Sequence, residues 1–274
     1  MAIDGTPLPT GEAASPVVIE SNTQLTPDVP SALGGDVVYG ACEWPLPSLA
    51  SRRRTRRVAA AELSNAAMVG QRPRWARAAK RAIDLVVSLA GLTLGFPIFL
   101  VLAVAVLVFD GWPIFFPWDV IGEHGRPFRG YKFRTMVLGA HAQRSDLADH
   151  NEMQGPVFKM RDDPRVTRLG AMLRRFSLDE LPQLWSVLKG DMSLVGPRPL
   201  GPEEYAQATP YQRQKLSVVP GITCLWQVMG RNEISDFDAW VALDLQYIEE
   251  FSLLLDLKIL ARTIPIVLRR RGAW

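Results

Sequence analysis

Cysteine and histidine are scarce in this chain of 274 residues. The two cysteines, Cys42 and Cys224, lie far apart without the spacing of a metal site, and no cysteine stands near His124, His141 or His150. This arrangement favours neither a disulfide scaffold nor a zinc site, and it fits a reducing compartment. The first nine residues lack an apolar run, so we expect no cleavable secretory signal.

Lysine and arginine are absent from residues 1–50, which are acidic and rich in Pro, Ser and Thr. This composition, without helical or strand periodicity, is typical of a disordered tail. Residues 51–82 then form a basic juxtamembrane arm, whose cations include Arg52, Arg53, Arg54, Arg56, Arg57, Arg72, Arg74, Arg77, Lys80 and Arg81. An arm that leads directly into an apolar segment favours anionic lipid headgroups, at about 1 kcal/mol per basic residue, over nucleic acid. We therefore expect no nucleic-acid partner.

Charged residues are also absent from Leu85 to Phe109. At about 1.5 Å per residue, a helix of this length could cross a hydrocarbon core of about 30 Å. However, Gly91, Gly95 and Pro97 interrupt the segment. Proline removes a backbone donor and clashes with the carbonyl four residues before it, so the sequence predicts a bend near Pro97.

The basic residues on both flanks of this segment decide how it meets a membrane. The positive-inside rule places both groups on the cytoplasmic side, which a single straight crossing cannot satisfy. A helix that breaks inside one leaflet and returns can satisfy it. We therefore predict a re-entrant membrane helix over residues 83–110, with a single span and a buried core helix as alternatives. The downstream cations are Arg126, Arg129, Lys132 and Arg134.

The remaining pattern predicts a mainly α fold with a small β element. Pro127 to Met136 has an extended pattern, whereas Arg165–Phe176 and Leu181–Lys189 have apolar residues at helical spacing. Phe237–Phe251 and Leu253–Leu268 are also apolar on one face and are followed by a cluster of arginines. This pattern is typical of helices lying in the membrane interface. The expected architecture is a re-entrant helix and amphipathic interfacial helices around a compact domain.

The residues most suited to catalysis lie between Arg174 and Leu200, where the adjacent carboxylates Asp179 and Glu180 stand among several cations. Phosphoryl transfer from a diphosphate uses a hard cation such as Mg²⁺, a carboxylate that holds it, and arginines that bind phosphate oxygens. A carboxylate can also attack phosphorus itself and form an acyl phosphate. These residue types are therefore consistent with phosphoryl transfer.

A purely structural explanation exists for the same residues. Ser177-x-x-Glu180 is a capping box, in which the two side chains satisfy free amides at a helix start and Asp179 favours the helix dipole. Pro182 counts against it, because a proline there suggests that a new helix begins. Gly196–Pro199 could be only a rigid turn, and residues 229–232 only a loop. The residues alone leave both explanations open.

A series of ordered strings narrows this choice, and together they cover residues from about Arg77 to Trp274. They are Lys80-Arg81-Ala82-Ile83-Asp84, Pro113–Phe116, Tyr131-Lys132-Phe133-Arg134-Thr135-Met136, Ser177–Gln183, Gly190–Pro199, Pro220–Thr223 with Leu225–Val228, Gly230-Arg231-Asn232 and Asp256-Leu257-Lys258. This set resembles the bacterial sugar transferase family, the monotopic polyprenyl-phosphate phosphoglycosyl transferases, in its small catalytic form.

The resemblance implies a phosphoglycosyl transferase with defined residue roles. Asp179 is similar to the nucleophile that attacks the sugar-bearing phosphate of a UDP-sugar and releases UMP. Glu180 is similar to the second carboxylate, which with Asp179 holds Mg²⁺ or assists deprotonation of the acceptor, polyprenyl (undecaprenyl) phosphate. The residues that match the family's phosphate- and substrate-binding positions are Arg174, Arg198, Arg231, Pro197 and Pro199.

The resemblance also implies a place for the chain in the cell. It is expected at the bacterial inner membrane in contact with lipid, with a catalytic domain of residues 111–274 facing the cytoplasm, and it would begin exopolysaccharide or related glycan synthesis. Lys80 and Arg81 would lie at the lipid headgroups, and Pro97 would break the re-entrant helix. A homo-oligomer and the identity of the sugar stay open.

Two departures from the family pattern stand out. Phe96 replaces the serine that commonly precedes the helix-breaking proline, and residues 117–121 lack the usual Gln and Arg. A catalytically silent membrane scaffold is the alternative function. The intact set of Asp179, Glu180, Arg198 and Arg231 favours the enzyme.

Overall fold

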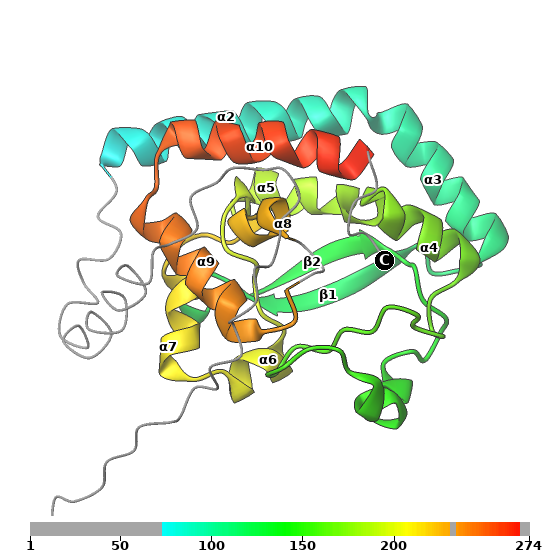
Figure 1. Ribbon diagram of the computed structural model, residues 1–274. Helices are drawn as coiled ribbons and strands as arrows, with labels where there is room; N and C mark the ends of the chain where they lie inside the picture. Colours follow the sequence, from blue (N-terminus) through cyan, green and yellow to red (C-terminus); the bar gives the residue numbers. More distant parts are fainter. Residues whose placement is uncertain (1–72, 231–233, 269–274) are drawn as a thin grey trace, which may run out of the picture. The chain divides into compact units, whose positions relative to one another are not determined.

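The computed structural model describes residues 73–230 and 234–268 (Figure 1). The predicted acidic tail, most of the basic arm and Arg231 lie outside the described residues. The helices are α2 (Arg74–Leu94), α3 (Phe96–Phe109), α4 (Arg168–Arg175), α5 (Leu184–Lys189), α6 (Pro202–Gln207), α7 (Pro210–Arg213), α8 (Leu225–Met229), α9 (Phe237–Glu249) and α10 (Leu253–Leu268). Four short 3₁₀ segments are η1 (Glu123–Gly125), η2 (Ala142–His150), η3 (Leu178–Gln183) and η4 (Gln214–Ser217). The strands are β1 (Phe115–Ile121), β2 (Pro127–Phe133), β3 (Ser193–Val195) and β4 (Gly221–Thr223), so the mainly α prediction is confirmed.

The apolar segment forms two helices, α2 and α3, bent by 61° relative to each other (Figure 1). Among the described residues no single helix is long and apolar enough to cross a membrane, although the bent pair passes that test by length and composition. The break falls at Gly95, and Pro97 lies in the first turn of α3, where its missing N–H breaks no helical bond. The predicted bend near Pro97 is thus confirmed, and a single straight helix is wrong.

Glycine is required at this bend. The Gly95 N–H donates to the Gly91 carbonyl at 3.0 Å, and a Cβ on Gly95 would lie 2.3 Å from that carbonyl oxygen. Thr93, close to the break, donates its hydroxyl to the Leu89 carbonyl of α2 at 2.8 Å.

Strands β1 and β2 form an antiparallel hairpin in which Trp118 pairs with Gly130. The extended pattern over Pro127–Met136 is confirmed by β2. Residues 117–121, which depart from the family sequence, lie within β1, where Pro117 and Asp119 are exposed and Val120 is buried. Lys132 pairs with Phe116, and opposite residues of an antiparallel pair share a face. Trp118 is two residues from Phe116 on β1, so Trp118 and Lys132 project from the same side of the hairpin.

The second sheet is a parallel pair, β3 with β4, at the centre of the fold. Its backbones approach closely at two glycines: a Cβ on Gly221 would lie 2.0 Å from the Gly196 nitrogen, and a Cβ on Gly196 would lie 2.6 Å from the Val219 carbonyl oxygen. Only glycine fits at either position. The Gly196–Pro199 segment is therefore fixed directly after β3.

The main apolar core lies around this sheet and includes much of α9. Phe237, Trp240, Val241, Tyr247 and Ile248 of α9 are buried, and the Trp226 and Trp240 rings stack with centroids 4.1 Å apart. The expectation that 237–251 lies in the membrane interface is wrong, because the apolar face of α9 packs into the protein core. On α10, by contrast, Leu254, Leu257, Ile264 and Leu268 are exposed.

A smaller apolar cluster attaches α3 to the hairpin. The rings of Phe99, Phe115 and Phe133 lie with centroids 4.9–5.7 Å apart, and Leu102 and Val106 of α3 are buried beside them. Most other apolar side chains of α3 are exposed: Phe96, Ile98, Leu100, Val101, Val104, Leu107, Val108 and Phe109. The buried-core-helix alternative for this segment is therefore wrong.

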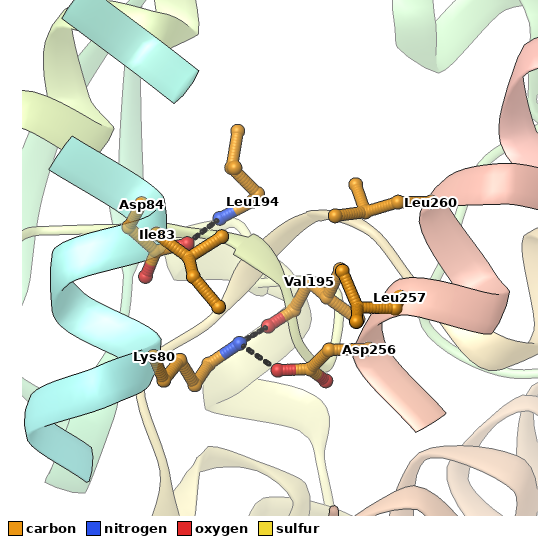
Figure 2. A pocket seen from close by; sticks show the side chains of 8 residues that line it. All are labelled: Lys80, Ile83, Asp84, Leu194, Val195, Asp256, Leu257 and Leu260. Atoms are coloured by element: carbon orange, nitrogen blue, oxygen red, sulfur yellow. Dashed lines mark hydrogen bonds and ion pairs between the residues drawn. The ribbon is translucent and has the colours of Figure 1, made fainter. Parts of the chain in front are cut away.

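A buried polar cluster holds α2 to β3 and α10 (Figure 2). Lys80 Nζ donates to the Val195 carbonyl at 2.8 Å and pairs with Asp256 Oδ2 at 2.7 Å, while Tyr247 donates to the other Asp256 oxygen at 2.7 Å. Asp84 accepts from the Leu194 N–H at 2.9 Å and from the Ser193 hydroxyl at 3.0 Å. We call these residues the α2 clamp.

The α2 clamp corrects the membrane-anchoring role predicted for Lys80. Its side chain points into the protein and is only 8% exposed, because a buried carboxylate and a carbonyl replace its water shell. Arg81 is half-buried and donates to the carbonyls of Val187 and Leu188 at 2.5 and 2.7 Å. It therefore satisfies the C-terminal carbonyls of α5, and its contact with lipid stays a prediction.

Candidate active site

Asp179 and Glu180 lie on η3, which follows a sharp turn at Ser177. Ser177 has a φ of +53°, a left-handed conformation that is unusual for a residue other than glycine, and its side chain does not cap the helix. The capping-box explanation is therefore wrong. Instead, η3 runs through Pro182 into α5, which begins at Leu184 and agrees with the predicted new helix after the proline.

Asp179 is a buried carboxylate, 8% exposed. Burial raises its pKa, and the neighbouring charge of Glu180 raises it further, whereas Lys132 and Arg174 act in the opposite direction. Two carboxylates placed side by side in a partly dehydrated site repel each other, so cations must accompany them if both are to be ionised. The structure supplies those cations from β2 and α4.

Lys132 is the cation supplied by β2. Its Nζ lies 2.9 Å from Glu180 Oε1, and both side chains are largely buried. A pair of this kind is held more firmly than one on an open surface, because water screens it less. Lys132 belongs to the string Tyr131–Met136, which contributed to the family resemblance, but the sequence alone did not assign it a role at the site.

Arg174 is the cation supplied by α4. Its Nε donates to Thr135 Oγ1 at 2.9 Å, and its charge acts on both Asp179 and Glu180. Helix α4 lies against Thr135 because Gly170 has no side chain: a Cβ there would lie 2.1 Å from the Thr135 carbonyl oxygen. Gly170 therefore lets α4 approach closely enough for Arg174, one turn later, to reach the site.

Trp118 lies beside two cations of the site. Lys132 Nζ lies 4.4 Å from the centre of its ring, and Arg198 Cζ lies 5.8 Å from it. Cations at such distances from an indole are attracted to its electron-rich face. Trp118 thus connects the hairpin cation that pairs with Glu180 to the arginine of the Gly196–Pro199 segment.

Arg198 is half-buried, whereas Pro197 and Pro199 on either side of it are buried. The Pro197 carbonyl accepts from the Gly221 N–H at 2.9 Å, and the Arg198 backbone acts to lower the pKa of Asp244, which burial raises. Asp244 is itself fully buried and pairs with Lys215 at 2.7 Å. The two prolines therefore shape the segment, and Arg198 is its residue with exposed surface for a ligand. This corrects the direct substrate-binding role expected of the prolines.

The two carboxylates are suited to a magnesium ion that also binds a diphosphate. Within residues 73–230 and 234–268, no group of three or more His, Cys, Asp or Glu side chains forms a metal cage. Magnesium does not need one, since it commonly takes one or two carboxylates and completes its shell with phosphate oxygens and water. The repulsion between Glu180 and Asp179 is also the kind that a divalent cation relieves.

The structure therefore brings together Asp179, Glu180, Arg174 and Lys132, with Arg198 joined to them through Trp118. Arg231 lies outside the described residues, so its predicted role is unchanged. Sequence reasoning did not find Lys132 or Trp118. The basic residues of the predicted strand were the signal that could have indicated Lys132. Trp118 lies in residues 117–121, which differ from the family pattern, so the family resemblance gave it no role.

Comparison with known proteins agrees with this arrangement. A profile of the bacterial sugar transferase family matches residues 75–270. The galactosyl transferase CpsE of Streptococcus agalactiae serotype III (strain NEM316) is 47% identical over 195 residues, which cover 71% of this chain and 43% of that protein. The undecaprenyl-phosphate galactose phosphotransferase of Salmonella typhimurium is 40% identical over 205 residues, 73% of this chain and 43% of that protein.

A shorter relative matches over most of its length. The exopolysaccharide production protein ExoY of Rhizobium meliloti is 39% identical over 204 residues, which cover 72% of this chain and 88% of that protein. By contrast, the chain spans less than half the length of the Streptococcus and Salmonella relatives. The family profile covers the helices and strands that build the site, and the chain therefore belongs to the bacterial sugar transferase family.

Proposed function

We propose that this protein transfers a sugar 1-phosphate from a UDP-sugar to polyprenyl (undecaprenyl) phosphate, as the first step in making an exopolysaccharide or related glycan. The observation that carries the proposal is the buried carboxylate of Asp179, set beside Glu180 and between the cations Lys132 and Arg174. The names of the Salmonella and Rhizobium relatives supply the acceptor and the pathway class.

The reaction has two displacements at one phosphorus atom. An Asp179 carboxylate oxygen attacks the sugar-bearing phosphate, the bond from that phosphorus to the bridging oxygen breaks, and UMP leaves with the bridging oxygen. A phosphate oxygen of the acceptor then attacks the same phosphorus and releases Asp179 as a carboxylate. The product is a polyprenyl diphosphate sugar. Without the Asp179 intermediate, the acceptor phosphate would have to attack the donor diphosphate directly. The intermediate divides that one difficult displacement into two easier ones.

The cations make attack by an anion on an anion feasible. Arg174 and Arg198 can donate to phosphate oxygens, and Lys132 holds Glu180 close to the nucleophile. Asp179 and Glu180 would together hold Mg²⁺, which neutralises phosphate charge when bound. Glu180 is then placed to accept a proton from the incoming acceptor phosphate. Lys132, paired with Glu180 at 2.9 Å, fixes the position of that carboxylate.

The bent helix pair supports a membrane-bound site. Helix α3 is apolar on all sides and exposes most of them, whereas soluble proteins rarely expose a continuous apolar surface of this kind. At about 1.5 Å per residue its 14 residues extend only about 21 Å, less than the roughly 30 Å of a hydrocarbon core. A helix pair that enters one leaflet and returns, with the catalytic domain at the cytoplasmic face of the inner membrane, fits these dimensions.

The test uses purified full-length protein in undecaprenyl-phosphate nanodiscs with Mg²⁺ and a panel of UDP-sugars, beginning with UDP-galactose because of the relatives' names. UMP release is expected with at least one donor, and Asp179→Asn should lower its rate on the order of 10⁴-fold. Mass spectrometry of protein quenched without acceptor should find a sugar phosphate on the peptide that contains Asp179. Glu180→Gln is the variant to compare with Asp179→Asn, because it also replaces a carboxylate with an amide of the same shape but leaves the nucleophile in place.

Two outcomes would count against the proposal. If Asp179→Asn retained most of the activity, another group would be the nucleophile. If no donor gave UMP while the folded protein still bound membranes, the alternative of a catalytically silent scaffold would be favoured.

A further inference from the structure

An apolar cleft opens beside the carboxylate pair. It encloses about 290 Å³, close to the lower end of the roughly 300–1,000 Å³ range of small-molecule pockets. Its walls come from η3, α5, β4, α8 and α10. The apolar side chains that shape it are Leu181, Leu184, Ile222, Val228, Ile266 and Val267.

Five polar side chains line the cleft: Ser177, Glu180, Thr223, Gln227 and Thr263. Glu180 is the charged one among them and is the sequence neighbour of Asp179. Elsewhere, the hydroxyls of Thr223 and Thr263 lie 2.8 Å apart, and the Gln227 side-chain oxygen accepts from the Cys224 N–H at 3.0 Å. The walls therefore have little hydrogen-bonding capacity for a sugar or a uridine, whose polar groups would lose water without replacement.

We propose that this cleft holds the first isoprene units of the acceptor, with its phosphate at the Glu180 end. The inference rests on the proposed function and identifies where its lipid substrate binds. An amphiphile with one anionic end matches a groove that is apolar along its walls and has Lys132 and Arg174 near its polar end. Such a ligand buries its chain and brings its phosphate to the nucleophile in one binding event.

Helix α10 connects the cleft to the surface that faces lipid in this proposal. Ile266 and Val267 line the cleft, whereas Ile264 and Leu268 on the same two turns are exposed. Cleft-lining and exposed apolar side chains are thus neighbours on α10, which gives a lipid chain apolar contacts on both sides of the cleft's edge.

The substitutions that test this inference narrow the cleft from α10. Ile266→Trp and Val267→Trp are the test variants, and Ile264→Trp is the matched control, because Ile264 is 61% exposed and does not line the cleft. Each variant is assayed with undecaprenyl phosphate and with geranyl phosphate, whose chain is short. The donor half-reaction is measured separately as the burst of UMP without acceptor.

Both cleft variants are expected to raise the KM for undecaprenyl phosphate and the KM for geranyl phosphate about tenfold each, because both acceptors place their first isoprene units in the cleft. The donor burst should keep its amplitude, because the cleft does not hold the donor, and Ile264→Trp should leave both KM values unchanged. If neither KM rises in the two cleft variants while their bursts are normal, the inference is wrong. If the wild type itself gives no burst, the proposed function fails instead.

A measurement on the wild type decides the matter even if both variants misfold. Photolabelling with a prenyl phosphate that carries a diazirine on its first isoprene unit should modify peptides of residues 222–228 or 253–268. Competition by undecaprenyl phosphate should suppress this labelling, and competition by phosphatidylglycerol should not. Labelling confined to α3, or suppressed equally by both lipids, would overturn the assignment.

Discussion

At the scale of single residues, the environment of Asp179 disfavours the ionised carboxylate that the proposed reaction requires. In the proposed reaction, attack on phosphorus needs the ionised carboxylate, whereas burial and the charge of Glu180 raise the pKa of Asp179 and favour its protonated form. Lys132 and Arg174 oppose this effect. The rate of the first step should therefore depend on pH at values above those at which an aspartate usually titrates.

The donor half-reaction is expected to slow as pH falls through the raised pKa of Asp179. Glu180→Gln removes the neighbouring like charge, so the acid limb of the profile should move to lower pH. Single-turnover UMP release between pH 4 and 8, under conditions where the protein stays folded, measures both profiles. An unchanged or upward-shifted limb in Glu180→Gln would contradict this account.

The same pKa shift makes a prediction about stability. A folded-state pKa above the unfolded value means that the folded protein binds more protons between the two values, so its stability falls as pH rises through them. Asp179→Asn should therefore melt at a higher temperature than wild type at pH 7 without metal, with about 2–4 °C for each kcal/mol gained. The difference should shrink as pH falls. A variant that melts lower at pH 7 would show that Asp179 is stabilised rather than strained.

Trp118 is predicted to position the cations Lys132 and Arg198. Trp118→Ala should lower kcat about tenfold, because two attractions of about 0.5–1 kcal/mol each that position the cations are lost. Trp118→Phe, which keeps an aromatic face, should recover much of the activity. Trp185→Ala is the control for loss of a tryptophan, since Trp185 is 54% exposed, whereas the cations Lys132 and Arg198 lie over Trp118. Equal losses in the Ala and Phe variants would exclude a cation–π role.

At the scale of secondary-structure elements, the Phe99–Phe115–Phe133 cluster determines whether α3 stays attached to the hairpin. Phe99→Ala should destabilise the folded domain by about 3 kcal/mol, the lower end of the usual cost of removing a packed phenylalanine. Phe109→Ala, on the same helix but 76% exposed, should leave thermal stability unchanged and weaken retention in vesicles. Similar melting shifts in both variants would mean that α3 is not held by these rings.

The elements also show how far sequence reasoning reaches. Helical spacing located α4, α9 and α10 closely, because each has a continuous apolar stripe. The same stripe could not distinguish a core from a membrane: α9 packs inside the protein, whereas α10 exposes Leu254 and Ile264. Strands β3 and β4 have three residues each, too few for a period of two to be recognised. Asp179 and Glu180 were found through the family resemblance, whereas Lys132 meets Glu180 only because the hairpin lies against η3.

At the scale of the whole molecule, the α2 clamp joins the first described helix to the last. Lys80→Met should destabilise the protein by about 3–5 kcal/mol, because Asp256 is left buried without its cation. Lys80→Met combined with Asp256→Leu should lose much less than the sum of the two single changes. Denaturation of the four proteins in one detergent gives the coupling, and simple additivity would show that the pair does not act as a unit.

The α2 clamp has a consequence for how the protein leaves a bilayer. Asp84 and Lys80 stand at the polar end of the bent helices, and both are bonded to the backbone of the strand that leads to Arg198. If the α2–α3 pair lies in lipid as proposed, pulling it out of the bilayer pulls on β3, and melting β3 and β4 frees the helix pair. We expect extraction from lipid and displacement of Arg198 to occur as one cooperative event, so that no water-soluble, active intermediate is released.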